Sequence, residues 1–497
     1  MSVCHIFHCG IILEVSCFSN FKCLMTPNQE FHSSRQKLFN TFSSTEQEEV
    51  QLVLKGGYPY IKSLDLFIPQ NLDIDKLLRE NPPNKRLKRD KLIYILHLIN
   101  WLHSRKKDNL ENSDGYTHIS RFVLNKTIKN YKDYIEYLKN CKIIEEDKNY
   151  IVGKKSRGIR FTNNYQTPIK PIKVTDWALI KNIVYLRKHY DFSATMKLSF
   201  LKKNFEKLNV DISGAKEFLD SQYLEDIKEK KEFPHLAYNS RLLPILKLYL
   251  KDDILFFVDN TSGRLHTNLT QLKTKLRKFV RYDGKVLYSI DLTNSQPFLL
   301  QSLLEAELFI KNKMEEKINS VSPSEDISLI KKLIIRNSNK EDVQLFRKIV
   351  SSGEFYEKFS EILISAGELE NEPNKDMRSF VKDITFSSIF SKNTSARYNK
   401  AIVLFKKTFP TVYKIISRIK KERHATLAII LQRLESELFL QKCCKIIYEE
   451  RPDIPIFTLH DSIITTKENI EYVKSIIEKV LLEHINAKPH LKVERWE

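Results

Sequence analysis

The sequence predicts a helix-rich α+β protein with several domains. Glycine is scarce, with 11 in 497 residues, which argues against folds built on glycine-rich nucleotide loops. Apolar residues recur at helical spacing along much of the chain, whereas the stretches 286–290 and 454–466 are β-prone. At about 150 residues per domain, the length predicts roughly three domains.

The overall charge predicts a polyanionic partner. The chain has 82 Lys and Arg against 62 Asp and Glu, a formal charge of +20. On a chain without a membrane-spanning apolar run, such a surplus most often serves nucleic acid, although a merely basic surface is the alternative. Seven cysteines without a regular framework favour a reducing compartment, so we expect a cytoplasmic protein.

Residues 1–84 form an N-terminal segment whose role the sequence leaves open. Two cysteines and two histidines between Cys4 and Cys9 are zinc-ligand types, but no second pair follows at a usual spacing. The apolar stretch 6–18 has no Lys or Arg before it, which argues against a secretory signal. Translation could instead begin at Met25, and residues 1–24 would then be dispensable.

Residues 85–165 have the element order of a winged helix-turn-helix module. Helical patterns at 92–102, 119–128 and 131–143 are followed by a strand, a basic turn and a second strand. The turn carries Lys154, Lys155 and Arg157, which we expect to contact DNA phosphates. An ordinary helical subdomain with a solvated hairpin is the alternative. Residues 166–260 read as a helical connecting region without distinctive chemistry.

The segment 261–497 contains two aspartates at predicted strand ends. Asp291 ends a β-prone run, and Pro297 follows at the start of an apolar helix. Asp461 lies in His460-Asp461-Ser462, which reads as a tight hairpin between two strands. A carboxylate at a buried strand end needs a partner, and two such carboxylates can hold two Mg²⁺ ions that activate a hydroxyl and stabilise pyrophosphate.

The segment 378–390 combines two cations with two aromatic rings. Arg378, Lys382, Phe386 and Phe390 recur every four residues and share one face of a predicted helix. The cations can neutralise a triphosphate, and the rings can cover a base and a sugar. A surface helix with basic residues beside core aromatics fits this segment alone equally well.

Four segments in this order resemble the family A polymerases, which include bacterial DNA polymerase I and the single-subunit phage and mitochondrial RNA polymerases. "SGRLHTNL" is similar to the segment that grips the primer–template duplex. "DLTNSQPFLL" resembles motif A, "RSFVKDITFSSIF" resembles motif B, and "LHDS" resembles motif C. The resemblance covers roughly residues 260–497.

The resemblance implies a right-hand polymerase palm with an antiparallel sheet and helical fingers over 261–497, with 166–260 as a thumb-like region. It assigns two Mg²⁺ ions to Asp291, Asp461 and the carbonyl of Leu292. Lys382 would hold the triphosphate and donate a proton to pyrophosphate. The other nucleotide-binding residues would be Arg378, Phe386, Phe390 and Gln296, and the primer–template contacts would be Arg264, Arg277, Gln432 and His460.

Two departures from the family pattern and the last residue of motif C bear on the sugar of the nucleotide. Gln296 stands where the DNA polymerases have a glutamate that blocks the 2′-hydroxyl and the RNA polymerases have a small residue. Phe390 replaces a tyrosine, and Ser462 ends motif C as in the RNA polymerases. Because glutamine is bulky enough to act as a gate, deoxynucleotides are favoured.

The sequence therefore predicts a DNA-directed DNA polymerase that extends a primer, for replication of a plasmid, phage or integrated element. The expected partners are a DNA primer–template, nucleoside triphosphates and other replication proteins, without a membrane. A primase-like or single-subunit RNA polymerase that uses NTPs is one alternative. A non-catalytic DNA-binding replication initiator is the other.

Overall fold

The computed structural model describes residues 60–104, 114–147, 157–184, 190–251, 255–323, 326–369 and 376–497. The segment 1–59, with the Cys4–Cys9 group, lies outside the described residues, as do Lys154 and Lys155. The described residues form many helices and four sheets with antiparallel strand pairing. The predicted helix-rich α+β class is confirmed at this level.

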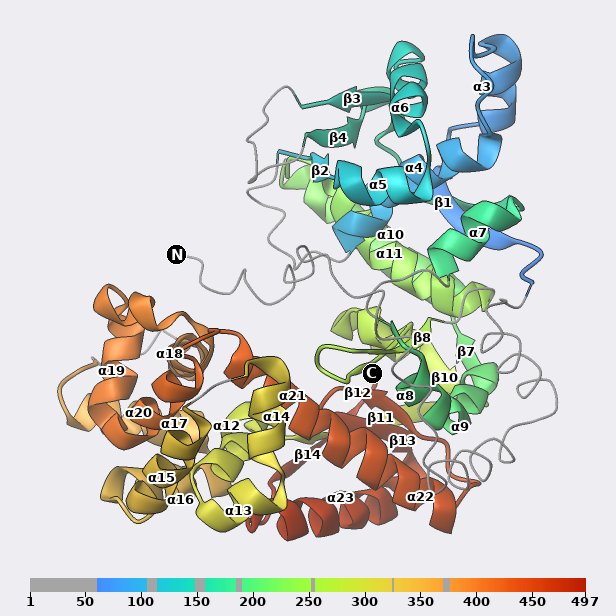
Figure 1. The fold of residues 1–497 in the computed structure, drawn as a ribbon. Coiled ribbons are helices and arrows are strands. Elements are labelled where there is room, and N and C mark those ends of the chain that lie inside the picture. Colours follow the sequence, from blue (N-terminus) through green and yellow to red (C-terminus); the bar gives the residue numbers. More distant parts are fainter. Residues whose placement is uncertain are drawn as a thin grey trace, which may run out of the picture.

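The N-terminal part, at the top of Figure 1, surrounds one hydrophobic core between Leu64 and Val184. A three-stranded sheet has the order β2-β4-β3. Its elements follow in the chain as α4 (Arg89–Ser104), β2 (Thr117–His118), α5 (Arg121–Thr127), α6 (Tyr131–Asn140), β3 (Ile144–Glu146) and β4 (Gly158–Phe161). The three predicted helices and the strand pair are therefore present.

Four more elements complete this part: β1 (Leu64–Pro69), α3 (Ile74–Glu80), β5 (Ile169–Val174) and α7 (Trp177–Val184). β1 and β5 pair antiparallel, with Leu64 opposite Val174. Asp73 caps α3 by accepting the backbone N–H groups of Asp75 and Lys76. Residues from both ends of the segment thus enter the same core.

A helical hairpin connects the N-terminal part to the large sheet. It consists of α10 (Ile212–Lys228) and α11 (Pro234–Leu250), and α11 packs against α4 (Figure 1). The core around α11 reaches from Phe67 of β1 to Trp496 near the C-terminus. The neighbouring small elements are β6 (Tyr190–Asp191), α8 (Phe192–Lys197), α9 (Ser199–Lys202), β8 (Phe256–Asp259) and β9 (Leu265–Thr267).

The large sheet has the order β12-β13-β11-β10-β7, and β14 pairs with the other edge of β11. Its strands are β7 (Leu208–Val210), β10 (Val280–Tyr282), β11 (Lys285–Leu292), β12 (Phe457–Leu459), β13 (Ser462–Thr466) and β14 (Leu491–Arg495). In the central strand β11, Ile290 and Leu292 enter the largest core while Leu287 enters the core around α11. Side chains alternate along a strand, so Ser289 and Asp291 share the Leu287 face.

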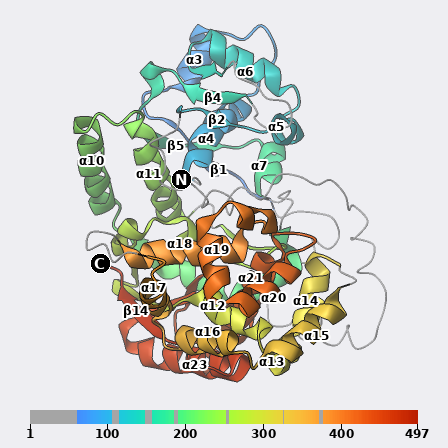
Figure 2. The same cartoon turned by 90° about the vertical axis from the view of Figure 1, so that its left-hand side faces the viewer.

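Helices cover the rest of the sheet and form a second lobe, on the left of Figure 1. They are α12 (Ser295–Leu300), α13 (Ala306–Lys311), α14 (Met314–Val321), α15 (Ile327–Asn337), α16 (Glu341–Ser351), α17 (Phe355–Ser365), α18 (Met377–Phe390), α19 (Lys400–Thr408), α20 (Pro410–Ile419), α21 (Thr426–Ser436), α22 (Cys444–Glu450) and α23 (Ile470–Ile485). Figure 2 shows α17, α18 and α19 together, below the N-terminal part.

Aromatic rings in mostly edge-to-face and tilted contacts form the core of this lobe. Five phenylalanine rings contact one another with centroids 5.1–6.5 Å apart. They belong to α16 (Phe346), α17 (Phe355 and Phe359), α19 (Phe405) and the residue after α19 (Phe409). All five are fully buried. These contacts pack α16, α17 and α19 against one another, and α17 and α19 also contact α18. Among the described residues, no helix combines the length and apolar character needed to cross a membrane.

Candidate functional site

The predicted tight hairpin brings Asp461 next to Asp291. β12 and β13 are joined by His460 and Asp461 alone, with Leu459 opposite Ser462 and His460 in the left-handed region at φ 57°. Asp291 lies opposite Ser462 on the neighbouring strand, and the backbone N–H of Leu292 donates to the backbone carbonyl of Asp461 at 3.2 Å. The prediction of a hairpin with a carboxylate at its tip is confirmed.

Both carboxylates are partly exposed, yet their surroundings disfavour the charged form. Burial raises the pKa of Asp291, against the opposing hydrogen bond that Ser289 donates at 2.9 Å. Burial also raises the pKa of Asp461, and the negative charge of Asp291 adds to this effect. A cation placed between the two groups would relieve both penalties.

The C-terminal strand adds charged residues that the sequence analysis missed. In the β11–β14 pairing, Lys492 lies opposite Asp291 and Glu494 lies opposite Ser289. The charge of Glu494 raises the pKa of Asp291. The register of β14 against β11 is a long-range property, so the motif spacing contained no signal for these residues.

Arg277, a predicted duplex contact, lies near Asp291. Its guanidinium is 5.6 Å from the ring centre of Trp496, and burial lowers its pKa while Asp291 and Glu494 raise it. The positive charge of Arg277 in turn lowers the pKa of Asp291. Its contact with a duplex stays a prediction.

Glu435 of α21 joins two other predicted site residues. Its two carboxylate oxygens accept from Nε and Nη2 of Arg264 at 2.9 and 2.8 Å, and Nε2 of Gln296 donates to it at 2.8 Å. The carboxyl is buried, and burial raises its pKa to about 7. Gln432, the residue predicted from the sequence, lies one turn earlier on the same helix, and Glu435 was not predicted.

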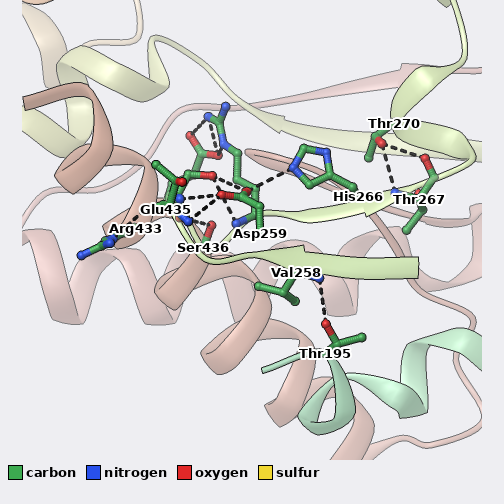
Figure 3. Close-up of polar contacts among 12 residues, drawn as sticks. Thr195, Val258, Asp259, His266, Thr267, Thr270, Arg433, Glu435 and Ser436 are labelled. Carbon is green, nitrogen blue, oxygen red and sulfur yellow. Dashed lines mark hydrogen bonds and ion pairs between the residues drawn. The ribbon is translucent and has the colours of Figure 1, made fainter. Parts of the chain in front are cut away.

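A second polar group surrounds Asp259, whose backbone N–H donates to the backbone carbonyl of Arg264 at 3.1 Å; Figure 3 shows Asp259 beside Glu435. Asp259 accepts from the backbone N–H and hydroxyl of Ser262 at 2.7 and 2.6 Å and lies 3.1 Å from Nε2 of His266. These contacts hold the pKa of Asp259 well below its ordinary value, although burial opposes them. The ring of His266 lies 6.4 Å from that of His460, so this group reaches the Asp461 hairpin.

A polar cavity of about 310 Å³ adjoins this group. Its lining includes Asp259, Asp191, Lys317, Arg433 and Glu437. Lys317 pairs with Glu437 at 2.8 Å, and Arg433 donates to the backbone carbonyl of Thr261 at 2.7 Å (Figure 3 shows Arg433). The charged groups of the cavity thus bond to one another and to the chain.

The segment 378–390 forms the predicted helix, α18. Its opposite face is buried through Val381, Ile384 and Ile389, while Lys382 is exposed. The Lys382 ammonium lies 5.6 Å from the Phe386 ring, and the Phe386 and Phe390 rings are 5.6 Å apart. The cation–aromatic face that the spacing predicts is therefore present on α18.

Tyr356 of α17 connects α18 to the carboxylates. Arg378 lies over its ring at 5.4 Å and pairs with Glu357 at 2.7 Å. Burial raises the pKa of Tyr356, and the charges of Arg378 and Asp461 both act on its hydroxyl, in opposite directions. The charges of Arg378 and Asp461 therefore both act on one side chain, so the N-terminal end of α18 and Asp461 lie within electrostatic range of Tyr356.

Lys420 holds the other end of α18. Its side chain is buried, and its ammonium donates to the backbone carbonyls of Ser388 and Ser391 at 2.7 and 3.0 Å. These carbonyls end the helix, where a cation is favourable. Burial lowers the pKa of Lys420 to about 7. The sequence analysis did not single out this residue.

Asp291 and Asp461 fit a divalent cation as a pair of oxygen donors. Their raised pKa values show two carboxylates that lack full compensation within the chain. In the part of the chain that the structure describes, no three His, Cys, Asp or Glu side chains form a metal-ligand group. A third ligand would have to come from the backbone, as expected for Leu292, or from a substrate.

The predicted DNA contacts of the N-terminal part are described only in part. Arg157 is exposed and lies 4.0 Å from Glu146, whereas Lys154 and Lys155 lie outside the described residues. On α6, Lys139 pairs with Glu136 and Glu146 at 3.4 and 3.6 Å. The helix before the turn therefore presents balanced charge.

No family model matches the chain, and no curated protein matches it. Among solved structures, a similar one is the POL domain of Pol1 from M. smegmatis in complex with DNA primer-template and dNTP. The TM-score is 0.28 and the identity 11%, over 65% of this chain and 73% of that one.

Proposed function

We propose that the protein is a template-dependent nucleotidyltransferase that extends a nucleic-acid primer. The observation that carries the proposal is the approach of Asp291 and Asp461, two partly exposed carboxylates with raised pKa values. The cation–aromatic face of α18 supports it, because the charges of Arg378 and Asp461 both act on the hydroxyl of Tyr356. In this proposal the large sheet is a polymerase palm, the helical lobe is its fingers and the α10–α11 hairpin is thumb-like.

The two carboxylates would hold two Mg²⁺ ions, with the Leu292 carbonyl as a further ligand. Bound there, the ions would supply the positive charge that lowers the pKa of the primer 3′-hydroxyl and neutralises the departing pyrophosphate. The primer 3′-oxygen forms a bond to the α-phosphorus, the bond to pyrophosphate breaks, and the hydroxyl proton is lost to water. The hydrogen bond from Ser289 favours the ionised form of Asp291 and opposes the effect of burial.

The α18 face would bind the nucleotide. Arg378 and Lys382 neutralise the triphosphate, and Lys382 supplies a proton to the leaving pyrophosphate. Phe386 and Phe390 cover the base and sugar. Lys420 fixes the C-terminal end of this helix through its bonds to the Ser388 and Ser391 carbonyls.

The remaining cations would hold the DNA. The order α4, β2, α5, α6, β3, β4 supports a winged-helix module, with Arg157, Lys154 and Lys155 on phosphates. Because Lys139 of α6 is paired with acidic neighbours, the wing rather than this helix would supply most of the charge. Near the palm, Arg277, Gln432 and His460 would contact the primer–template, and Arg264 would do so while held by Glu435.

Primer extension on a DNA template tests the proposal. Wild-type protein is expected to extend the primer with Mg²⁺, and Asp291→Ala and Asp461→Ala are expected to lose extension. Asp453→Ala is the matched control, because Asp453 is an exposed carboxylate before β12 that pairs with Arg451. A wild type that extends nothing, or alanine variants that extend equally well, would contradict the proposal.

A further inference from the structure

The N-terminal part contains a stretch of chain without acidic residues. Residues 115–132 include no Asp or Glu, but they include Arg121, Lys126, Lys129 and Lys132. The three lysines are exposed. The stretch includes α5 and the turn that leads into α6. This part of the surface therefore has positive charge that no acidic residue of the same stretch offsets.

α5 presents an aromatic ring to the outside within this stretch. Leu124 and Ile128 are fully buried, whereas Phe122 on the opposite side of the helix is 58% exposed. Asn125 and Lys126 follow Phe122 at helical spacing and are exposed as well. The Lys126 ammonium lies 4.2 Å from the centre of the Phe122 ring. The outward face of α5 therefore combines a flat ring with positive charge.

Arg121 holds α5 in place within the module. Its Nη2 donates to Glu146 of β3, and its guanidinium lies 5.8 Å from the centre of the Tyr131 ring of α6. The buried Leu124 and Ile128 add packing against the hydrophobic core of the module. The outward face of α5 is therefore fixed relative to β3 and α6.

The neighbours of Phe122 indicate which kind of partner would cover it. The core of a protein interface is a wider apolar patch, whereas Asn125, Lys126 and Lys129 next to this ring are polar or cationic. A nucleic-acid duplex keeps the faces of its bases inside the base stack. An unpaired strand exposes these faces and carries a phosphate for each base, so it can contact both the ring and the lysines.

We propose that the outward face of α5, formed by Phe122, Asn125, Lys126 and Lys129, binds single-stranded nucleic acid. A base stacks on the Phe122 ring, and the two lysines contact phosphates, for which the flexible Lys126 side chain moves away from the ring. Every base has a face that can stack, so the site does not read sequence. This inference goes beyond the proposed function, because binding at α5 needs neither a nucleoside triphosphate nor a divalent cation.

The first test measures affinity with the full chain, without nucleotide or divalent cation. Labelled oligo-dT, oligo-U and a DNA duplex are the probes. Phe122→Ala is expected to weaken binding of both single strands by roughly tenfold and to leave duplex binding unchanged. Phe122→Tyr keeps a ring and should retain the wild-type affinity. Ile310→Ala is the matched control, because Ile310 on α13 is 60% exposed.

The second test places a probe on the α5 face, so that other nucleic-acid contacts of the chain do not contribute. Oligo-dT is expected to quench the added fluorescence of Phe122→Trp, because a stacked base lies against the indole, whereas a duplex is not. The control Ile310→Trp should show no quenching. Lys129→Gln should reduce the slope of log affinity against log salt for oligo-dT by about 0.7, which corresponds to one phosphate contact. Lys76→Gln, exposed on α3, should not.

Three results would each overturn the inference. They are an unchanged single-strand affinity of Phe122→Ala, an equal loss for single strand and duplex, and a Phe122→Trp protein that oligo-dT does not quench. Binding to phosphatidylserine vesicles that Phe122→Ala weakens, without a loss for single strands, would overturn it in favour of a membrane surface. None of these results involves Asp291 or Asp461, so primer extension tests the proposed function separately.

Discussion

The two halves of the candidate site are built differently. The carboxylate half gathers Asp291, Asp461, Glu435 and Arg264 from strands and helices distant in the chain, and hydrogen bonds hold most of these groups within the fold. The α18 half comes from one continuous helix whose cations face outward. The carboxylate half is held in place by bonds within the protein before any ligand binds. The α18 half has exposed cations that a negatively charged ligand can bind.

This difference predicts different kinetic roles. A preorganised, partly buried group acts mainly on the transition state and changes kcat, whereas exposed cations act mainly on binding and change KM. Changes in the two halves should therefore have different kinetic signatures as well as different sizes.

The largest effect is expected in the carboxylate half. Asp461→Asn or Asp291→Asn should lower the single-turnover rate at saturating nucleotide by on the order of 10³-fold, because an amide cannot supply the charge that the cations need. Rapid-quench measurement of one incorporation checks this. A loss that appears only in KM would remove the distinction between the halves.

Lys382→Ala should have the largest effect on α18. We expect a loss of about 10²-fold in kcat/KM, since the ammonium both binds the triphosphate and donates a proton. Arg378→Ala should cost less, because Glu357 already shares the charge of Arg378. Lys406→Ala, exposed on α19, is the control. Equal effects of the Lys382 and Lys406 changes would exclude α18 from the site.

Lys420→Met should destabilise the lobe that carries α18. The Ser388 and Ser391 carbonyls would lose their donor in a buried position, which costs about 1–3 kcal/mol of the free energy of unfolding. Chemical denaturation checks the loss, with exposed Lys414→Met of α20 as control. An unchanged free energy of unfolding would show that water replaces the ammonium.

The smallest effect concerns Asp259 and acid stability. The folded protein holds the pKa of Asp259 below its ordinary value of 3.8, so the unfolded state binds this proton more readily. The stabilisation is present above pH 3.8 and is lost as the pH falls below it, by about 1 kcal/mol at pH 3. Denaturation of wild type and Asp259→Asn between pH 3 and 7 should show a shallower acid loss in the variant. An equal loss of the free energy of unfolding in both proteins as the pH falls would contradict this role of Asp259.

The same contrast explains what could be predicted from the sequence. The α18 face and the Asp461 hairpin follow from local periodicity and turn chemistry, and the structure has both. Glu435 was missed because its partner Arg264 is 171 residues away, and nothing in the spacing of α21 separates it from Gln432. Lys492 and Lys420 were missed for the same reason: a strand register and a helix-end contact place them.

The orientation of the Gln296 side chain was even harder to predict from the sequence motifs. The position and bulk of Gln296 favoured deoxynucleotides, but its hydrogen-bond partner Glu435 determines how its side-chain amide is oriented. That partner lies 139 residues away. Side-chain orientation was therefore beyond the sequence, although the residue itself was found.

The central claim is that Asp291 and Asp461 form one divalent-cation site, and Mn²⁺ binding tests it without relying on activity. Electron paramagnetic resonance titration would use protein with primer–template and a non-hydrolysable nucleoside triphosphate. Wild type and Asp453→Asn are expected to bind Mn²⁺ alike, and Asp291→Asn and Asp461→Asn are each expected to lose that binding. Wild-type binding in both single variants would contradict the claim.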